Sequence, residues 1–315
     1  MTTGKIAVLF PGQGSQFVGM GQEFAAIDAE ARAIFELTNT VCGKDISGLC
    51  HNGPLEELTQ AVNLQPALTA VNLICWQALR KAHVQVDYVA GHSLGEYAAL
   101  HAAGVLGQED TLRLVAARGR IMGEAGAKNP GGMVAILGLE RAAIEEILDT
   151  LASPELIAIG NDNSAQQLVL SGSTELLKQA TELACAKGAK AVPLAVSIAN
   201  HSPLMASALP AFKEAFASVP LQAPRIPIFF NVTAETESNP ETIRTIMAQQ
   251  IVSTVRWQEI ILKLLSCRVE TFIEVGPKKV LSGLLKRILP KGASHQCLQI
   301  DSPATLAHCL TALGL

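Results

Sequence analysis

A serine in a glycine-flanked pentapeptide is the residue best placed for covalent chemistry. Ser93 lies in Gly91-His-Ser-Leu-Gly95, between a short β-rich run and a helical stretch. Small glycines permit a sharp turn there, which projects the serine hydroxyl. The backbone N–H of Leu94 then lies at a helix N-terminus and can stabilise an oxyanion. The alternative is a tight turn whose serine only caps the helix; we favour the nucleophile because strand, turn and helix follow in the required order.

A second glycine-rich turn, Pro11-Gly-Gln-Gly-Ser-Gln16, follows the first expected strand. One alternative is a dinucleotide-binding loop. However, the glycines at positions 12, 14, 19 and 21 do not match the G-x-G-x-x-G spacing, and no P-loop lysine follows. We therefore expect the loop to present a backbone N–H, that of Gln13, as a second donor to the oxyanion.

The base that activates such a serine is expected to be a histidine. His201, in Asn200-His-Ser-Pro-Leu204, lies in a loop just before an expected helix, where catalytic side chains are often found. The alternative is a histidine that caps this helix. The other histidines considered lie on the turn, on the next helix or near the C-terminus: His92, His101, His295 and His308. No aspartate stands at an obvious position to orient the base, which leaves a backbone or amide carbonyl as the candidate.

Arg118 is the residue most informative about the substrate. It lies on an expected helix from about residue 109 to residue 124, and its same-face neighbours are all apolar: Leu114, Val115, Ile121 and Met122. Arg113 and Arg120, by contrast, each have an acidic same-face neighbour. A buried guanidinium needs a fixed anion, either an internal Asp or Glu or the free carboxylate of a substrate. We favour the substrate carboxylate as the partner of Arg118, because the helix of Arg118 comes directly after the helix that follows Ser93.

The elements that position these residues follow an α/β pattern, in which short β-rich runs alternate with helices around a parallel sheet. We expect strands at 6–10, 88–90, 228–231 and 271–275 and helices at 66–82 and 94–103. After residue 132 the order becomes βαββαβ, typical of a ferredoxin-like module. Its strands are expected at 133–137, 156–161, 167–171 and 191–196, and its helices at 141–151 and 175–187. We predict a catalytic domain of residues 1–127 and 198–315 with an inserted subdomain of residues 128–197.

Composition excludes several classes of function. The 315 residues are 49% hydrophobic and 17% charged, as in a compact globular protein, and a net charge of −4 argues against a nucleic-acid partner. Seven scattered cysteines fit neither zinc-ligand spacing nor a disulfide framework, so we expect no metal and a reducing compartment. No apolar run approaches the roughly 20 residues of a membrane span. We therefore expect a cytoplasmic protein without a membrane partner.

Taken together, these residues resemble the malonyl-CoA:acyl carrier protein transacylases and the acyltransferase domains of polyketide synthases. The resemblance covers nearly the whole chain, in the family's order: Phe10-Pro-Gly-Gln-Gly-Ser-Gln16, Gly91-His-Ser-Leu-Gly-Glu96, Arg118-Gly119, His201-Ser-Pro-Leu-Met205, Asn231-Val-Thr-Ala234, Gln250 with Val255-Arg-Trp257, and Glu274-Val-Gly-Pro277. It implies an α/β-hydrolase-like core with a parallel sheet and an inserted ferredoxin-like subdomain.

By this resemblance Ser93 is the acylated nucleophile, His201 is its base, and the Gln250 carbonyl orients the histidine. Arg118 holds the distal carboxylate of a malonyl group. The other assigned residues belong to the oxyanion hole (Gln13 and Leu94) and to substrate binding (His92 and Asn200).

The implied reaction is a ping-pong transfer. Ser93 takes the malonyl group from malonyl-CoA, and the phosphopantetheine thiol of acyl carrier protein then takes it from the serine. Coenzyme A enters as part of the substrate, no further cofactor is expected, and the enzyme is expected to be a monomer. The transfer is reversible because a thioester and a serine ester are close in energy. Keeping water away from the acyl-enzyme is therefore part of the function.

Two departures from the family pattern leave the acyl group open. The residue before the base is often Phe or Ser in the family and tracks acyl choice; here it is Asn200, which is smaller than phenylalanine and would leave room for a branched group such as methylmalonyl. Thr254 stands where proline is common. Two other functions are weighed: an editing thioester hydrolase, which has no need of Arg118, and a catalytically silent carrier-binding module, which has no need of Ser93.

A local basic stretch could serve a partner. Residues 263–291 contain Lys263, Arg268, Lys278, Lys279, Lys286, Arg287 and Lys291 against Glu270 and Glu274. This stretch could dock an acidic carrier protein or the phosphates of coenzyme A. A solvated helix face is the alternative.

Overall fold

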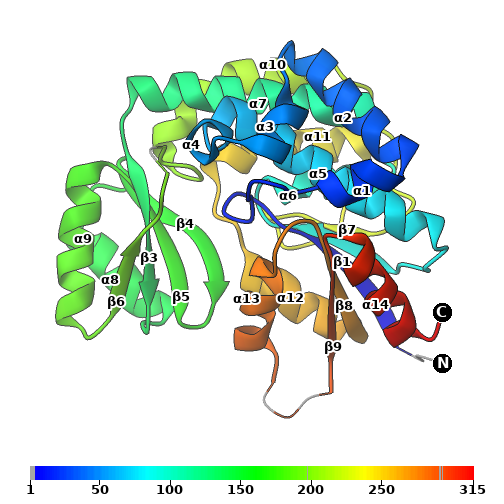
Figure 1. Ribbon diagram of the computed structural model, residues 1–315. Helices are drawn as coiled ribbons and strands as arrows, with labels where there is room; N and C mark the ends of the chain where they lie inside the picture. The colour runs from blue at the N-terminus through cyan, green and yellow to red at the C-terminus, as the bar shows by residue number, and fades with distance from the viewer. Residues whose placement is uncertain (1–3, 197, 291, 293) are drawn as a thin grey trace.

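The computed structural model describes residues 4–196, 198–290, 292 and 294–315 (Figure 1). Its strands are β1 (Lys5–Phe10), β2 (Tyr88–Gly91), β3 (Gly132–Leu137), β4 (Ile157–Ser164), β5 (Gln167–Gly172), β6 (Lys190–Pro193), β7 (Ile228–Phe229), β8 (Val269–Val275) and β9 (Gln296–Ile300). Its α-helices are α1 (Gln22–Ile27), α2 (Ala29–Cys42), α3 (Ile46–Asn52), α4 (Leu55–Leu58), α5 (Ala61–Lys81), α6 (Gly95–Ala102), α7 (Gln108–Lys128), α8 (Arg141–Leu151), α9 (Thr174–Ala186), α10 (Leu209–Ala217), α11 (Pro240–Gln249), α12 (Trp257–Ser266), α13 (Val280–Ile288) and α14 (Pro303–Leu313). Two short 3-10 helices are η1 (Pro203–Ala208) and η2 (Gln250–Val252).

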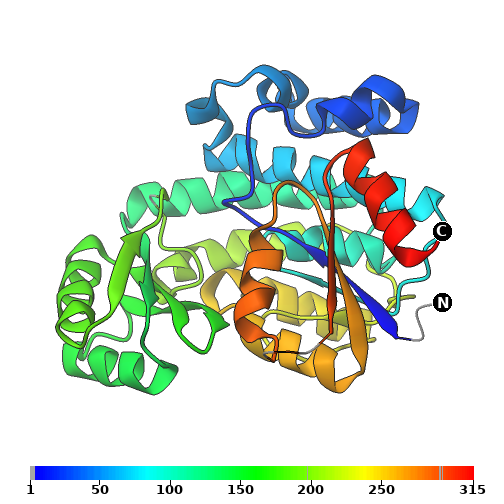
Figure 2. The same ribbon diagram turned by 60° about the horizontal axis from the view of Figure 1, so that its bottom comes forward.

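The larger sheet is parallel, and both of its faces are buried. Its order is β7-β2-β1-β8-β9. Side chains alternate between the two faces of a strand. In β1, Ile6, Val8 and Phe10 belong to the core formed with α5, α6 and α7, whereas Ala7 and Leu9 pack with α12 and α13. The helical layer over one face is plain in both views (Figures 1 and 2).

The smaller sheet is antiparallel, with the order β4-β5-β3-β6. Helices α8 and α9 cover one of its faces, so this part of the chain has the predicted βαββαβ arrangement. It stands beside the larger sheet in Figure 1. A mixed α/β fold with a parallel sheet and a ferredoxin-like antiparallel sheet is thus confirmed. The proposed domain boundaries stay a prediction, and Ser197, at one of them, lies outside the described residues.

The segment after η2 joins the two sheets. The backbone N–H of Val255 donates to the Gly160 carbonyl at 2.8 Å, and the Asp162 N–H donates to the Val255 carbonyl at 2.9 Å. The Thr254 hydroxyl donates to the Ile159 carbonyl at 2.7 Å, so the threonine that replaces the family's proline bonds to β4. The small sheet is therefore held beside the segment that follows Gln250.

Some elements differ from the sequence expectation. Strand β9 was not predicted, because its five residues, Gln-Cys-Leu-Gln-Ile, form an edge strand whose one partner in the described part of the chain is β8. Helix α5 begins at Ala61, five residues before the predicted start, and contains Pro66 within its early turns. Over the described ranges, no helix combines the length and apolar character needed to cross a membrane.

Candidate active site

Ser93 lies on a tight turn between β2 and α6. Its φ of 51° is in the left-handed region, an unfavourable conformation for a residue with a side chain. The flanking glycines are required by close packing. A Cβ on Gly91 would lie 2.1 Å from the Gly95 carbonyl carbon, and a Cβ on Gly95 would lie 2.1 Å from the Phe10 carbonyl oxygen. A larger residue at position 91 would push the start of α6 away from β2, and one at position 95 would push it away from the end of β1.

His201 is hydrogen-bonded to the serine hydroxyl. Its Nε2 lies 2.6 Å from Ser93 Oγ, and its Nδ1 lies 2.9 Å from the Gln250 carbonyl and 3.1 Å from the Ser253 carbonyl. Because carbonyls can only accept, Nδ1 carries the proton and Nε2 is free to accept one from the serine. Burial, followed by the positive charge of Arg118, lowers the pKa of His201 to about 3. The imidazole is therefore neutral and able to act as a base at pH 7.

The Pro11–Gln13 turn lies directly against the serine turn. A Cβ on Gly12 would lie 2.4 Å from the His92 carbonyl and 3.5 Å from the Leu94 nitrogen. The buried Asn72 side chain donates to the Pro11 carbonyl at 3.0 Å and fixes the turn from α5. Within the described ranges, neither the Gln13 nor the Leu94 N–H donates to an acceptor. Both amides are thus available near the serine, as an oxyanion hole requires.

Arg118 projects from α7 into the interior, where 3% of its surface is exposed. Its Nη1 donates to Gln65 Oε1 at 2.9 Å and its Nε to Gln250 Oε1 at 3.3 Å. Its Cζ stands 5.6 Å from the centre of the Tyr97 ring. No carboxylate of the described residues lies within 4.0 Å of it. The internal ion pair that the sequence left open is therefore not seen, and the partners of the guanidinium are neutral amides.

Comparison with known proteins gives the family. A model of the acyl transferase domain matches residues 8–299. The chain belongs to the acyl transferase domain family. The malonyl CoA-acyl carrier protein transacylase of Bacillus subtilis (strain 168) is 40% identical over 98% of this chain and 97% of its own length. An acyl-carrier-protein-S-malonyltransferase from Bartonella henselae superposes with a TM-score of 0.93 at 38% identity, over 99% of this chain and 100% of that one. A malonyl-transacylase in complex with its type II PKS acyl-carrier protein gives a TM-score of 0.93 at 34% identity, over 98% of this chain and 99% of that one.

A buried network that the sequence did not reveal holds the site of this acyl transferase together. Glu96, in the first turn of α6, accepts from the Asn231 N–H at 2.7 Å and from Gln250 Nε2 at 2.5 Å. The Asn231 side chain accepts from the Ser93 N–H and donates to the Gly91 carbonyl, both at 2.7 Å. The Gln250 Nε2 also donates to the Ser93 carbonyl at 3.0 Å. The signal in the sequence was only that Glu96 and Asn231 lie within motifs of the family.

His92 and Asn200, both expected to bind substrate, differ in their surroundings. His92 Nε2 lies 2.8 Å from Asn163 Oδ1 on β4, and its ring stands edge-on to Trp257 at 5.3 Å. This ring therefore links the serine turn to the small sheet. Asn200 lines a cleft, and its buried Oδ1 accepts no hydrogen bond from the described residues.

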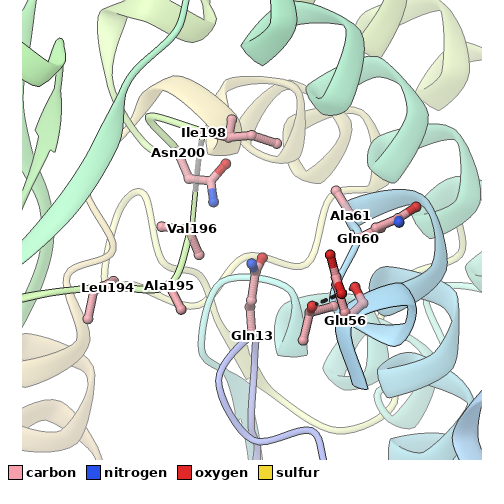
Figure 3. A pocket seen from close by; sticks show the side chains of 10 residues that line it. Gln13, Glu56, Gln60, Ala61, Leu194, Ala195, Val196, Ile198 and Asn200 are labelled. Atoms are coloured by element: carbon pink, nitrogen blue, oxygen red, sulfur yellow. Dashed lines mark hydrogen bonds between the residues drawn. The ribbon is translucent and has the colours of Figure 1, made fainter. Parts of the chain in front are cut away.

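The cleft beside Asn200 has a volume of about 480 Å³. One wall is the junction of α4 and α5, and the other is the segment that follows β6. The side chains of Gln13, Glu56 and Asn200 point into this space (Figure 3). Because Gln13 and Asn200 adjoin the oxyanion turn and the base, respectively, the cleft opens next to the Ser93–His201 pair.

The basic stretch of residues 263–291 is partly solvent-exposed. Lys278, Lys279, Lys286 and Arg287 are exposed, whereas Lys263 forms an ion pair with Glu235. Lys291 lies outside the described residues. Elsewhere, no group of three or more His, Cys, Asp or Glu side chains in the described ranges is arranged to hold a metal ion.

Proposed function

We propose that this acyl transferase moves a malonyl group from coenzyme A to the phosphopantetheine thiol of acyl carrier protein, in fatty acid or polyketide synthesis. The observation that carries the proposal is the pairing of a serine–histidine couple with a buried arginine that has no carboxylate partner among the residues that the structure describes. Gln250 connects them, because its side chain contacts both the Ser93 backbone and Arg118. The malonyl transacylases among the relatives and solved structures add support.

The first half-reaction forms an acyl-enzyme. His201 Nε2 takes the proton of the Ser93 hydroxyl as Oγ attacks the thioester carbonyl, and the N–H groups of Gln13 and Leu94 stabilise the oxyanion. As the C–S bond breaks, the coenzyme A thiolate leaves and takes the proton from His201. In the second half-reaction the carrier thiol gives its proton to His201 and attacks the ester, and Ser93 Oγ leaves with that proton.

Two carbonyls in place of an aspartate suit this chemistry. The Gln250 and Ser253 carbonyls fix the ring and its tautomer but add no full negative charge next to it. A thiolate is a better leaving group than the amine of a peptide, since a thiol has a pKa of about 8.5. The base therefore needs less stabilisation in its protonated form. Protonation of the ring is disfavoured in this buried site, so His201 is neutral at pH 7, the form in which Nε2 can accept the serine proton.

The malonyl group is proposed to reach Arg118 with its free carboxylate. A planar guanidinium binds a carboxylate through two parallel hydrogen bonds. Here Nε and one Nη are held by neutral amides, so the positive charge is not neutralised in direct contact. Methylmalonyl is the alternative acyl group, because Asn200 occupies the position that tracks acyl choice. A hydrolase would not need the buried cation, which favours transfer over hydrolysis.

The mass of the intact protein after incubation with malonyl-CoA tests this function. We expect a stable malonyl adduct on Ser93 that disappears when acyl carrier protein is added, and no adduct on Ser93→Ala. Rapid release of coenzyme A without an adduct would indicate the hydrolase. Absence of any reaction would indicate a silent binding module. We further propose a monomeric enzyme of the cytoplasm; the free state of all seven cysteines supports a reducing compartment.

A further inference from the structure

We infer that Glu96 is a positioning residue that sets the acyl preference of the enzyme by fixing the side chain of Gln250 against Arg118. The inference rests on the proposed function and adds a residue that determines specificity. Glu96 has no exposed surface. Arg118 is close enough for the two charges to interact, but no ion pair of 4.0 Å or less joins the two side chains. Its hydrogen bonds run instead to a backbone N–H and to a neutral amide.

The direction of the Gln250 amide follows from these contacts. Its Nε2 has two acceptors, Glu96 Oε2 at 2.5 Å and the Ser93 carbonyl at 3.0 Å. The Oε1 atom must then point the other way, where it accepts from Arg118 Nε at 3.3 Å. Glu96 and the Ser93 carbonyl together determine that an acceptor, and not a second donor, faces the guanidinium. The plane of Arg118 is fixed as a result, and a substrate carboxylate meets a preorganised group.

Only a carboxylate at position 96 can accept hydrogen bonds from both the Asn231 N–H and Gln250 Nε2. The Asn231 N–H is part of the backbone and cannot turn, so Glu96 Oε1 must remain an acceptor. In a Glu96→Gln variant the single amide oxygen is taken by that N–H, and the new NH₂ group faces Gln250. Gln250 Nε2 then meets a donor in place of its shorter-range acceptor and keeps only the Ser93 carbonyl, so the amide is expected to rotate in part of the molecules and to turn its own NH₂ toward Arg118. Two donors in contact would displace the guanidinium.

The same contact connects acyl recognition to the nucleophile. Gln250 holds the Ser93 carbonyl with its side chain and the His201 Nδ1–H with its backbone carbonyl. Asn231, on the other oxygen of Glu96, holds the Ser93 N–H. One buried carboxylate thus maintains the distance between the serine that carries the acyl group and the cation that recognises its far end. A malonyl group needs this distance, whereas an acetyl group does not.

The test is the ratio of kcat/KM for malonyl-CoA to kcat/KM for acetyl-CoA, measured with acyl carrier protein as acceptor. We expect Glu96→Gln to lower this ratio by about 10-fold to 100-fold, the loss typical of one hydrogen bond to a charged group. Glu274→Gln is the matched control. Glu274 is equally buried, but it accepts from the N-terminus of α13 through Leu281 and Ser282. Its variant is expected to lose stability and to keep the wild-type ratio.

Further variants separate the outcomes. Gln250→Met keeps the backbone carbonyl that orients His201 but removes the amide, so it should lower the ratio even if Glu96→Gln does not fold. The double variant of Glu96 and Gln250 should be no less selective than Gln250→Met alone, since both changes act on one contact. A wild-type ratio in Glu96→Gln or in Gln250→Met would overturn the inference, as would additive losses in the double variant. A wild-type protein that takes no malonyl group would instead overturn the proposed function.

Discussion

Replacement of Arg118 by alanine should abolish the preference for a carboxylated acyl group. The side chain is 3% exposed and is held by Gln65 and Gln250, so its position is set before substrate arrives. Truncation removes the cation and leaves the two amide oxygens without their donor. A malonyl group would then place its carboxylate in a buried site without a positive partner.

The magnitude follows from the contacts that are lost. Breaking a buried ionic pair by removing one partner costs about 3–5 kcal/mol. At about 1.4 kcal/mol for each factor of ten, kcat/KM for malonyl-CoA should fall by about 140-fold to about 4,000-fold. The value for acetyl-CoA should stay the same or rise, because acetyl has no carboxylate to lose and no longer faces a desolvated charge.

The assay compares transfer from malonyl-CoA and acetyl-CoA to acyl carrier protein by Arg118→Ala and by a control on the same helix. Arg113→Ala is the control, because Arg113 is 62% exposed and pairs with Glu109 at the surface. We expect it to behave like the wild type with both substrates. If Arg118→Ala still prefers malonyl-CoA, the reasoning about the buried guanidinium is refuted.

Three further outcomes are expected. His201→Ala should lower acyl transfer by about 100-fold to 10,000-fold in a protein that still folds, and near-normal rates would exclude His201 as the base. The acid side of the pH profile should differ between substrates. Burial raises the pKa of Glu96 to about 7 despite the hydrogen bonds from Asn231 and Gln250 and the charge of Arg118. Protonation below that pH therefore removes an acceptor and should lower kcat/KM for malonyl-CoA more than for acetyl-CoA. The pKa of His201, at about 3, is too low to cause this decline. An equal decline of kcat/KM with both substrates would contradict the assignment of the decline to Glu96. Charge reversal at Lys286 and Arg287 should raise KM for acyl carrier protein, and an unchanged KM would exclude this surface as the docking site.

Much of the fold follows from local patterns. The βαββαβ order was predictable because most of its strands and helices are long enough to show their own periodicity, and α8 has the predicted bounds, Arg141–Leu151. The last strand, β6, is only four residues long and ends at Pro193 rather than at the predicted residue 196. The burial of Arg118 was predictable for the same reason, since its apolar neighbours lie on the same helix. Strand β9 depends on pairing with β8 and has little local signal of its own.

The part of the site that the sequence did not predict consists of contacts between segments far apart in the chain. Glu96 looks like an ordinary acidic residue in the first turn of a helix, where such residues are common and exposed. Its burial becomes visible only when Asn231 and Gln250 are brought against it, 135 and 154 residues later in the chain. The spacing of residues along α6 does not contain this information. The neutral partners of Arg118, Gln65 and Gln250, escaped prediction for the same reason.

A crystal structure of the protein trapped after reaction with malonyl-CoA gives the most direct test of how serine and arginine work together. We predict electron density for an ester on Ser93 Oγ, with both oxygens of its distal carboxylate within hydrogen-bonding distance of the Arg118 guanidinium. An ester on Ser93 whose carboxylate points into solvent, or an acyl group on a different residue, would contradict the account.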